Sequence, residues 1–348
     1  MADYVIDGIF LTKRITGIQR YAIEITKELD KLIDDNTTIE LLLPEWYKGD
    51  FKLNNIKIIK YGNHSQRIWE QIDLMRYLKK NRTKGIFFEN TIPVFYKKGY
   101  VALHDIGLKV NPQLFNTSLK GFLTVMYRKY MYRLIVNSDM QIITVSEFSK
   151  SEILKHYNVN ESRIHVIYNA WQHIENIVED ENVIHRYSLE KYNYYFAMAT
   201  LAPNKNFKWI VEAAKNNPKK TFVIAGGGKI ADVISKDYSQ LTNLKYLGYV
   251  SDEEAKALMK YCEAFLFPTF YEGFGIPPLE AVASGAKEII ISDIPCLREI
   301  YDGFALYIDP SSVKSFSEIT EQTIDSSKLL EKYSWKESAN RLYRLLIG

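Results

Sequence analysis

Short apolar runs alternate with longer amphipathic stretches along the whole chain. Residues 4–10 and 39–43 form two such runs, and the stretch between them places Ile18, Tyr21 and Ile25 at helical spacing. The runs predict buried strands, and the spacing predicts a helix. Further strands are predicted at 56–59, 85–88, 100–103, 141–145, 165–167, 194–199, 221–225, 245–247, 264–267 and 289–291. Strands that alternate with helices predict the α/β class, with parallel sheets covered by helices.

The alternation is interrupted once. Between residues 171 and 191 the sequence becomes polar and loses its periodicity, which is typical of a linker. For 348 residues, two domains are expected. We predict an N-terminal domain over 1–175, a linker over 176–192, a second domain over 193–330 and a terminal helix over 331–348 that could cross back. Because open α/β sheets bind ligands at the carboxyl ends of their strands, the groove between the domains is the expected site.

Composition excludes several classes of protein. Hydrophobic residues make up 47% of the chain, enough for two folded cores. The two cysteines, Cys262 and Cys296, are too few for a disulfide framework or a cysteine-based zinc cluster, and fit a reducing cytoplasm. The N-terminus is acidic where a secretory signal is basic, and no apolar run reaches the roughly 18 residues that cross a membrane. We expect a cytoplasmic protein. Neither HExxH nor a DxD after a strand occurs, so no metal is expected.

The net charge of +3 conceals a strongly basic segment. Residues 51–135 contain sixteen Lys and Arg side chains but only four Asp and Glu. This excess of positive charge suggests an anionic partner, such as phosphate, a lipid headgroup or nucleic acid. A merely solvated surface is the alternative.

The stretch FLFPTFYEGFGIPPLEAVASG at 265–285 carries the most specific signal. A buried strand is followed by a glycine-containing loop, and a helix is expected to begin near the two prolines at 277–278. Glycine lets a backbone approach a ligand closely, and the amides of a helix start attract an anion or a hydroxyl. Glu272 in the loop and Glu280 in the first helical turn could face one ligand along its length. An acidic residue in a first turn can also serve only to balance the helix dipole.

This segment resembles the E-x7-E signature of retaining glycosyltransferases of family four, whose GT-B fold pairs two Rossmann-like domains. Other strings similar to the family occur in the same order along nearly the whole chain: TGIQRY, LHDIG, IITVSEFSKSEI, ATLAPNKNF, FVIAGGG, YLGYVSDEE and ALYIDP. The resemblance implies a doubly wound GT-B fold. It also implies an acceptor-side N-terminal domain, a second domain that binds a nucleotide sugar, and no divalent metal on the diphosphate.

The resemblance implies roles for four residues of the signature. The first glutamate of the family motif contacts the hydroxyls of the donor sugar, and the second holds the ribose of the nucleotide. These correspond to Glu272 and Glu280. Backbone amides of Phe274 and Gly275 would contact the sugar or the phosphate. Carboxylates suit this task because they accept hydrogen bonds from vicinal hydroxyls.

The family lysine that binds the donor diphosphate corresponds to Lys205, in the turn after the first strand of the second domain. A cation there would stabilise the departing nucleoside diphosphate. Many relatives also carry an arginine just before this lysine or five positions before it, where this chain has Asn204 and Thr200. Diphosphate binding is therefore expected to rest on Lys205 and on backbone amides, including those near Gly17.

His104 follows a predicted strand and matches a family histidine that lies beside the donor sugar, so the resemblance implies a catalytic role. Taken alone, His104 with Asp105 could equally be a loop histidine with satisfied hydrogen bonds, or the base of an inverting enzyme. Gly17 lies between the first predicted strand and the first predicted helix, where a glycine and a helix N-terminus could approach phosphate or acceptor, although a single glycine is a weak signal. Gly226 resembles a family glycine near the nucleotide base, although glycine after a strand is often only a turn. His173 is interpreted as a structural residue.

The sequence is interpreted as a retaining, metal-independent hexosyltransferase of cell-surface polysaccharide synthesis, such as lipopolysaccharide or capsule, that uses no cofactor. GDP-mannose is the first choice of donor because HDIG and GIQRY resemble the mannosyltransferase-like branch, and dTDP-rhamnose and UDP-hexoses follow. The acceptor is a hydroxyl of a glycan or of a lipid-linked glycan. Retention would proceed by front-face departure and attack, with double displacement through Glu272 as the alternative. The alternative functions are a non-catalytic partner or sugar-binding subunit, and a nucleotide-sugar epimerase.

Residues 119–135, LKGFLTVMYRKYMYRLI, mix basic and aromatic side chains on a predicted helix. Such a mixture suits a membrane interface, where cations meet anionic headgroups and tyrosine lies at the polar boundary. We expect peripheral attachment to the inner face of the plasma membrane, with Arg128, Lys129 and Arg133 among its cations. Nucleic acid is not expected as a partner, since no nucleic-acid motif accompanies the charge. An ordinary helix that packs by its aromatic side chains is the alternative.

Overall fold

The chain forms two compact units. A computed structural model describes residues 2–34, 37–115, 118–200, 202–227, 241–313 and 326–348. Unit 1 comprises Met1–Asn169 and Trp335–Gly348, and unit 2 comprises Ala170–Ser334.

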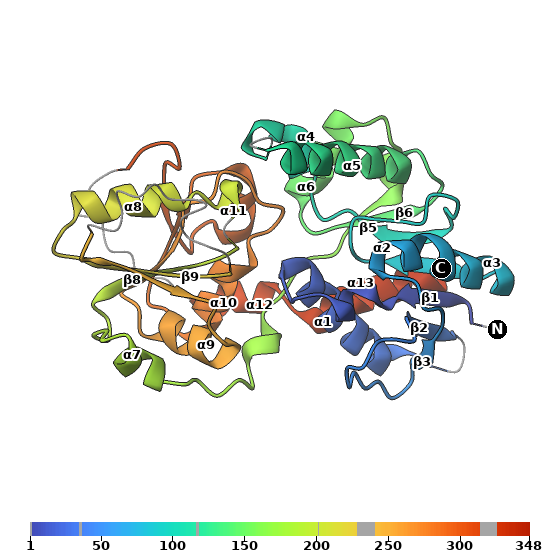
Figure 1. Cartoon of the computed structure of the whole chain (residues 1–348), viewed down its shortest axis with the longest axis horizontal. Coiled ribbons are helices and arrows are strands. Elements are labelled where there is room, and N and C mark those ends of the chain that lie inside the picture. The colour runs from blue at the N-terminus through green and yellow to red at the C-terminus, as the bar shows by residue number, and fades with distance from the viewer. Residues whose placement is uncertain (1, 35–36, 116–117, 201, 228–240, 314–325) are drawn as a thin grey trace. The chain divides into compact units, whose positions relative to one another are not determined.

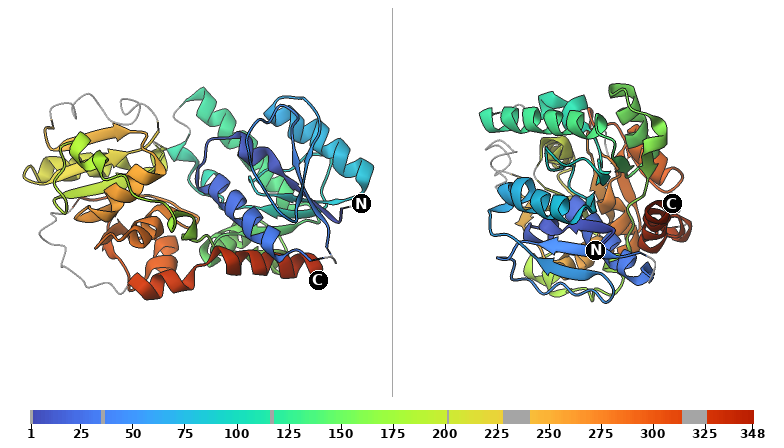
Figure 2. Two further views of the ribbon diagram at one scale, coloured as in Figure 1. Left: turned by 90° about the horizontal axis from the view of Figure 1, so that it is seen from below. Right: turned by 90° about the vertical axis from the view of Figure 1, so that its right-hand side faces the viewer.

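In the described part of unit 1, seven parallel strands form one sheet in the order β3-β2-β1-β4-β5-β6-β7. The strands are β1 (Tyr4–Asp7), β2 (Ile39–Leu43), β3 (Lys57–Lys60), β4 (Lys84–Phe87), β5 (Gly99–Ala102), β6 (Gln141–Thr144) and β7 (Ile164–Val166). The helices and helical turns are η1 (Gly8–Thr12), α1 (Gly17–Leu32), α2 (Gln66–Trp69), η2 (Glu70–Leu74), α3 (Met75–Asn81), α4 (Gly107–Val110), η3 (Pro112–Leu114), α5 (Leu119–Val136), α6 (Glu147–His156), η4 (Glu161–Arg163) and α13 (Trp335–Ile347). Helices cover both faces of this sheet (Figures 1 and 2), which is why most residues of its central strands β1, β4 and β5 are buried.

In the described part of unit 2, six parallel strands form a second sheet in the order β10-β9-β8-β11-β12-β13. The strands are β8 (Tyr194–Met198), β9 (Thr221–Ala225), β10 (Leu244–Gly248), β11 (Ala264–Phe267), β12 (Ile289–Ser292) and β13 (Leu306–Ile308). The helices and helical turns are η5 (Gln172–Ile174), α7 (Asn182–Arg186), η6 (Pro203–Lys205), α8 (Phe207–Asn216), α9 (Asp252–Lys260), α10 (Ile276–Ser284), α11 (Pro295–Tyr301) and α12 (Ser326–Lys332). Figure 1 shows α8 on one face of the sheet and α9 and α10 on the other. The predicted α/β class with two parallel sheets is confirmed.

The first predicted strand, 4–10, is too long. The strand ends at Asp7, whose side chain accepts a hydrogen bond from the amide of Ile9 at 3.1 Å and so turns the chain into η1. Residues 8–10 are apolar because they are buried in that helical turn, and their pattern resembles a continued strand. In unit 2, β13 was not predicted as a strand, since its three residues are too few for a clear pattern.

The boundary between the units differs from the predicted one. Residues 176–192, predicted as a linker, belong to unit 2. The ammonium of Lys256 on α9 donates to the carbonyls of Ile174 at 3.0 Å and of Ile177 at 2.7 Å. Hydrogen bonds of this kind hold the stretch against unit 2. They leave no hydrophobic periodicity in the sequence, and periodicity is the signal from which the domain boundary is predicted.

The terminal helix belongs to unit 1, although unit 2 precedes it in the chain. In this unit α13 packs along α1 (Figure 1). The hydroxyl of Tyr4 on β1 donates to the carbonyl of Leu346 at 2.7 Å, and Trp335 is buried with its ring against Tyr21. The last residues of the chain therefore complete the core of the first domain.

Candidate functional site

Each sheet has a position at which folds of this class commonly bind ligands. The strand order runs outward in two directions from a central pair, β1 and β4 in unit 1 and β8 and β11 in unit 2. The carboxyl ends of such a pair are the topological switch point at which open α/β sheets bind ligands. In unit 2 the segments after β8 and β11 carry Lys205 and Glu272. In unit 1, Asp7 ends β1 and Glu89 follows β4.

The structure brings Lys205 and Glu272 into direct contact. The ammonium of Lys205 donates to Oε1 of Glu272 at 2.6 Å, and it lies 5.4 Å from the centre of the Phe267 ring. The two side chains are only 19% and 11% exposed, so water screens their attraction less than it would on an open surface. The pair places one cation and one anion together at the switch point of unit 2.

The loops that carry this pair are tied to each other. The side-chain amide of Asn204 donates to the carbonyl of Tyr271 at 3.1 Å, and the amide of Phe270 donates to the carbonyl of Asn204 at 2.8 Å. The Thr269 hydroxyl lies 2.8 Å from Oε1 of Glu272. Asn204 thus fixes the loop of Lys205 against the loop of Glu272.

The helix after Glu272 begins one residue before the predicted proline pair. Gly275 caps α10 with a left-handed backbone (φ 86°), and a Cβ on it would lie 2.7 Å from Leu297, so only glycine fits there. Phe274 is buried, with its ring 5.3 Å from that of Tyr333. Because α10 starts at Ile276, Glu280 is its fifth residue and lies beyond the first turn. The prediction of a first-turn position is wrong, and a purely dipole-balancing role loses its basis.

Glu280 has a partner that the sequence did not reveal. Nε2 of His173 lies 2.8 Å from Oε1 of Glu280, and the His173 side chain is 1% exposed. His173 comes from η5, more than a hundred residues earlier in the chain. The sequence interpretation took His173 as a structural residue, and no local pattern links it to Glu280. A buried histidine that holds a carboxylate in place restricts how that carboxylate can meet a ligand.

Gly226 has a structural reason to be glycine. Its φ is 155°, and a Cβ would lie 1.9 Å from the carbonyl oxygen of Ala199 at the end of β8. Its amide donates to the carbonyl of Gly248 at 2.7 Å, and its carbonyl accepts from the Tyr246 hydroxyl at 2.8 Å. Close approach of the strand ends thus accounts for this glycine, while a contact with the nucleotide base stays a prediction. Gly228 of the same string lies outside the described residues.

In unit 1 the predicted His104 is buried and engaged within the protein. Its Nε2 lies 2.7 Å from the carbonyl oxygen of Phe88, its amide donates to Oδ1 of Asn90 at 2.8 Å, and its ring meets that of Tyr21 edge to face at 4.9 Å. Burial lowers the pKa of His104 to about 4. The ring is therefore neutral near pH 7, and a role beside the donor sugar stays a prediction. Gly17 is exposed and is the first residue of α1.

Three buried carboxyl groups lie near the switch point of unit 1, and the sequence interpretation missed them. Burial, with the charge of Glu70 nearby, raises the pKa of Asp7 well above its usual range, and burial also raises the pKa of Glu70. Glu89 forms an ion pair with Lys13 and accepts a hydrogen bond from the Gln19 side chain at 2.6 Å. Perturbed carboxyl groups at a switch point are candidates for function. Asp7 lies in the middle of the predicted strand 4–10, so the sequence pattern gives no sign that it ends the strand at the switch point.

Helix α5 presents a face of exposed apolar side chains. These side chains are those of Leu119, Phe122, Leu123, Met126, Tyr127 and Tyr130. Lys120 and Arg133 are exposed on the same helix and Lys129 is half-buried, whereas Tyr132 is buried in the core. Arg128 donates to the carbonyls of Glu89 at 3.2 Å and Asn90 at 3.4 Å, so it is a structural residue and is not available as a surface cation.

Two further properties follow from the described residues. No three His, Cys, Asp or Glu side chains among them gather in a way that could hold a metal ion. None of the helices in the same ranges is long and apolar enough to cross a bilayer.

Comparison with known families divides the chain into two adjoining parts. Residues 15–171 match the family described as Glycosyltransferase Family 4, and residues 179–339 match the family described as Glycosyl transferases group 1. The matches therefore include Gly17 and His104 in the first part, and Lys205, Glu272 and Glu280 in the second.

Two curated relatives are similar to the chain. It is 30% identical over 232 residues to the O-antigen chain mannosyltransferase RfbU of Salmonella typhimurium, a match of 65% of this chain and 61% of the relative. It is 26% identical over 359 aligned positions to the O-antigen chain mannosyltransferase B of Escherichia coli, a match that covers 93% of this chain and 90% of the relative. Among solved structures, sucrose-phosphate synthase from Thermosynechococcus elongatus has a TM-score of 0.73 over 99% of this chain and 98% of its own, at 12% identity. That likeness concerns the fold alone, and it agrees with the predicted pair of Rossmann-like domains.

Proposed function

We propose that this chain is a retaining hexosyltransferase of the GT-B type, which moves mannose from a nucleotide-diphosphate sugar to a hydroxyl of a glycan or lipid-linked acceptor; the two family matches support this proposal. In this proposal unit 2 binds the donor and unit 1 binds the acceptor. The observation that carries the proposal is the contact between Lys205 and Glu272 at the switch point of unit 2, with Glu280 eight residues further on.

The donor site follows from the chemistry of these three side chains. Glu272 would accept hydrogen bonds from hydroxyls of the donor sugar, and Glu280 would accept them from the ribose. Lys205 would contact the diphosphate, whose charge grows as the sugar leaves. Amides of Phe274 and Gly275 at the start of α10 would support the sugar or the phosphate.

Mannose is favoured as the sugar because both relatives described above are O-antigen chain mannosyltransferases by name. GDP-mannose is accordingly the first donor to test, followed by dTDP-rhamnose and UDP-hexoses. The same relatives favour cell-surface polysaccharide as the product.

The reaction that we propose keeps the configuration at the anomeric carbon. The bond between that carbon and the phosphate oxygen breaks, and its electron pair stays on the phosphate. The acceptor hydroxyl attacks from the same face, and its proton passes to the departing phosphate oxygen. Lys205 supplies positive charge to the leaving group, so the proposal requires neither a metal ion nor a cofactor.

A double displacement through Glu272 is less favoured. Oε1 of this carboxylate accepts from the Lys205 ammonium at 2.6 Å and lies 2.8 Å from the Thr269 hydroxyl. Donors so close withdraw electron density from the oxygen, which makes it a weaker nucleophile. The arrangement suits a group that holds the sugar in position.

We also propose that α5 attaches the enzyme to an anionic membrane surface. Helix α5 combines its exposed apolar and aromatic side chains with the exposed Lys120 and Arg133 and the half-buried Lys129. Apolar side chains that enter the headgroup region, together with cations that meet anionic lipids, give reversible interfacial binding. Attachment of this kind would place unit 1 beside a lipid-linked acceptor.

A panel of donors tests the proposed function. The purified chain is given GDP-mannose, dTDP-rhamnose, UDP-glucose or UDP-galactose, with and without octyl α-mannoside as acceptor. Transfer from GDP-mannose to the acceptor is expected. A non-catalytic subunit would bind a nucleotide sugar without turnover, and an epimerase would convert the nucleotide sugar without any acceptor. Either result would overturn the proposal, and transfer from another donor alone would overturn the assignment of mannose.

A further inference from the structure

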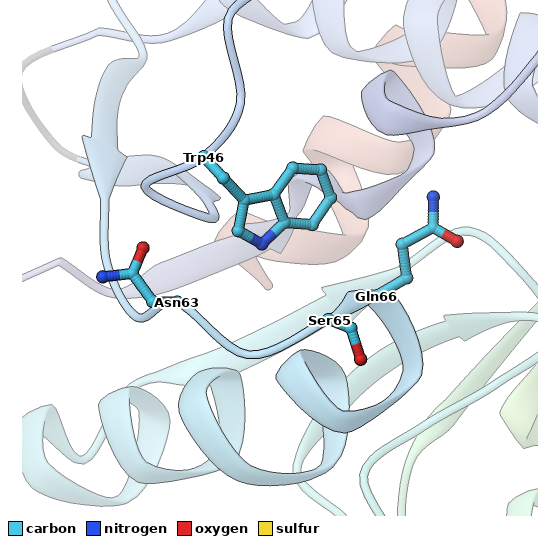
Figure 3. A pocket seen from close by; sticks show the side chains of 4 residues that line it. All are labelled: Trp46, Asn63, Ser65 and Gln66. Carbon is cyan, nitrogen blue, oxygen red and sulfur yellow. The ribbon is translucent and has the colours of Figure 1, made fainter.

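A hollow of about 620 Å³ lies at the carboxyl edge of the sheet in unit 1, lined by Trp46, Asn63, Ser65 and Gln66 (Figure 3). Trp46 follows β2, Asn63 and Ser65 follow β3, and Gln66 begins α2. The volume falls within the range of about 300 to 1,000 Å³ that is usual for small-molecule sites. None of the four residues has a part in the reaction proposed above.

Trp46 is the feature that distinguishes this hollow. Its side chain is 36% exposed, whereas Trp69, Trp209 and Trp335 are buried and Trp171 is half-buried. The indole nitrogen donates to the carbonyl of His64 at 2.9 Å, which fixes one edge of the ring. Figure 3 shows the indole between Asn63 and Gln66. A large aromatic ring that is anchored at its edge offers a flat apolar surface without losing a hydrogen bond.

The loops around the hollow are held in place by their own bonds. The side chain of Asn63 donates to Oε2 of Glu45 at 2.7 Å, and the amide of Glu45 donates to the carbonyl of Gly62 at 3.0 Å. The ring of His64 lies 2.9 Å from the carboxylate of Asp73. These contacts join the segment after β2 to the segment after β3. A ligand would therefore meet a largely preformed surface, which lowers the entropy lost on binding.

The chemistry of the lining points to a neutral, hydroxyl-rich ligand. An indole face, two side-chain amides and a hydroxyl carry no formal charge, and the amides can each donate and accept hydrogen bonds. A pyranose has an apolar C–H face that can cover an aromatic ring and hydroxyls that can meet amides. A phosphate would need a cation, and the described part of the lining holds none; an acyl chain would need an apolar wall throughout.

The hollow is also connected to the part of unit 1 where the acceptor is expected. The side chain of Gln66 lies 3.4 Å from the carbonyl oxygen and 3.3 Å from the hydroxyl of Thr12. Thr12 ends η1, five residues before Gly17 and the start of α1. We propose that the hollow binds an inner sugar residue of the acceptor glycan, behind the residue that receives the new sugar. This inference rests on the proposed function, because it assigns the acceptor to unit 1.

Two measurements test the subsite with neutral α-linked manno-oligosaccharides of one to four residues as the probe. The first follows tryptophan fluorescence in a titration, since Trp46 is the most exposed of the five tryptophans. The wild type should respond to the tri- and tetrasaccharide. Trp46→Ala should lose the response, and Phe95→Ala, a change at a 75% exposed side chain outside the lining, should keep it.

The second measurement follows transfer to acceptors of increasing length. Trp46→Ala should raise KM for the trisaccharide acceptor about tenfold, an ordinary loss for one aromatic contact. KM for a monosaccharide acceptor and kcat should stay unchanged, and Trp46→Tyr should restore part of the difference. An equal effect on short and long acceptors, or a fluorescence response to GDP or to neutral vesicles in place of the sugars, would overturn the subsite. If no donor supports transfer, the proposed function fails, while the titration still decides whether the hollow binds sugar.

Discussion

The ammonium of Lys205 lies 2.6 Å from Oε1 of Glu272, although the two residues follow different strands of the second sheet. In the absence of donor each neutralises the other. When a diphosphate arrives, Lys205 can contact it and still orient Glu272 toward the sugar. The two residues therefore act as one unit in the proposed reaction.

Substitution of either member of this pair should mainly lower the turnover number. Glu272→Ala and Lys205→Ala should each lower kcat by about 10²-fold or more, because each removes an interaction that strengthens as the bond to phosphate breaks. KM for the donor should change little in Glu272→Ala. Steady-state kinetics of the double variant provide the control, since its loss should be much smaller than the product of the single losses. Independent, multiplicative losses would show that the pair does not work as a unit.

Glu280 and His173 should act on donor binding. Glu280→Ala should weaken the affinity for GDP measured by calorimetry, since the proposed contact is with the ribose. His173→Leu should have a smaller effect of the same kind, because Glu280 loses the group 2.8 Å away that holds it. His173→Gln, which can still donate a hydrogen bond, should restore most of the affinity.

A ribose analogue separates positioning from general damage at this pair. The affinity for 2′,3′-dideoxy-GDP should be nearly the same in the wild type, Glu280→Ala and His173→Leu. If the histidine variants weaken the binding of GDP and the binding of the dideoxy analogue equally, His173 has no specific effect on ribose binding. If Glu280→Ala also leaves GDP binding unchanged, the assignment of Glu280 to the ribose is wrong.

The buried ring of His104 should make unit 1 sensitive to acid. The pKa of this histidine is lowered to about 4 by burial, against about 6.5 in an unfolded chain. Between these values the unfolded chain binds a proton that the native ring does not, so stability falls as pH drops through that window and is fully present above 6.5. The total loss is about 3 kcal/mol, at about 1.4 kcal/mol for each pH unit.

Nuclear magnetic resonance and thermal unfolding can check this shift. The histidine signal that is missing in His104→Gln should titrate with a midpoint near 4 in the wild type. The unfolding temperature of the wild type should also fall more steeply than that of the variant between pH 6.5 and 4. Parallel curves, or an ordinary midpoint for this signal, would contradict the buried neutral ring.

Charge reversal on α5 should release the enzyme from anionic membranes. The wild type should co-sediment with vesicles that contain phosphatidylglycerol but not with phosphatidylcholine alone, and salt should reduce the binding. Lys120, Lys129 and Arg133 should be changed to glutamate together, because each basic side chain near such a surface contributes about 1 kcal/mol. Arg128 is left intact, since its bonds to the carbonyls of Glu89 and Asn90 hold the fold.

A second triple variant controls for net charge. Lys57, Lys79 and Lys80 are exposed on β3 and α3 and lie in the same basic segment of the sequence. Their conversion to glutamate changes the charge equally but leaves α5 untouched, so this variant should still bind. Equal recovery of the wild type with both vesicle types, or equal loss in the two variants, would refute attachment through α5.

The sequence predicted the sheets well because buried strands in parallel sheets are continuous apolar runs. The strands at 39–43, 221–225 and 264–267 have the predicted bounds. The prediction was less accurate where apolar residues are buried outside strands, as in residues 8–10. It was also less accurate where a polar stretch is fixed by hydrogen bonds, as in residues 176–192, where Lys256 donates to the carbonyl of Ile177.

The candidate site was predictable only where its residues lie in one short string. Glu272 and Glu280 are eight positions apart and could be read together from the sequence. His173 lies more than a hundred positions from Glu280, and Asp7 lies more than sixty from Glu70. Contacts over such separations depend on how the strands are ordered in the sheet. The hydrophobic periodicity of the sequence predicts the strands but not their order.

The anomeric configuration of the product tests the central claim most directly. The wild type would be incubated with GDP-α-mannose, octyl α-mannoside and EDTA, and the new linkage would be followed by the coupling of its anomeric carbon and proton. We predict an α-linked product, formed at the same rate with and without EDTA, because Lys205 and Glu272 support departure and attack on one face without a divalent ion. A β-linked product, or transfer that appears only after Mg²⁺ or Mn²⁺ is restored, would contradict this account.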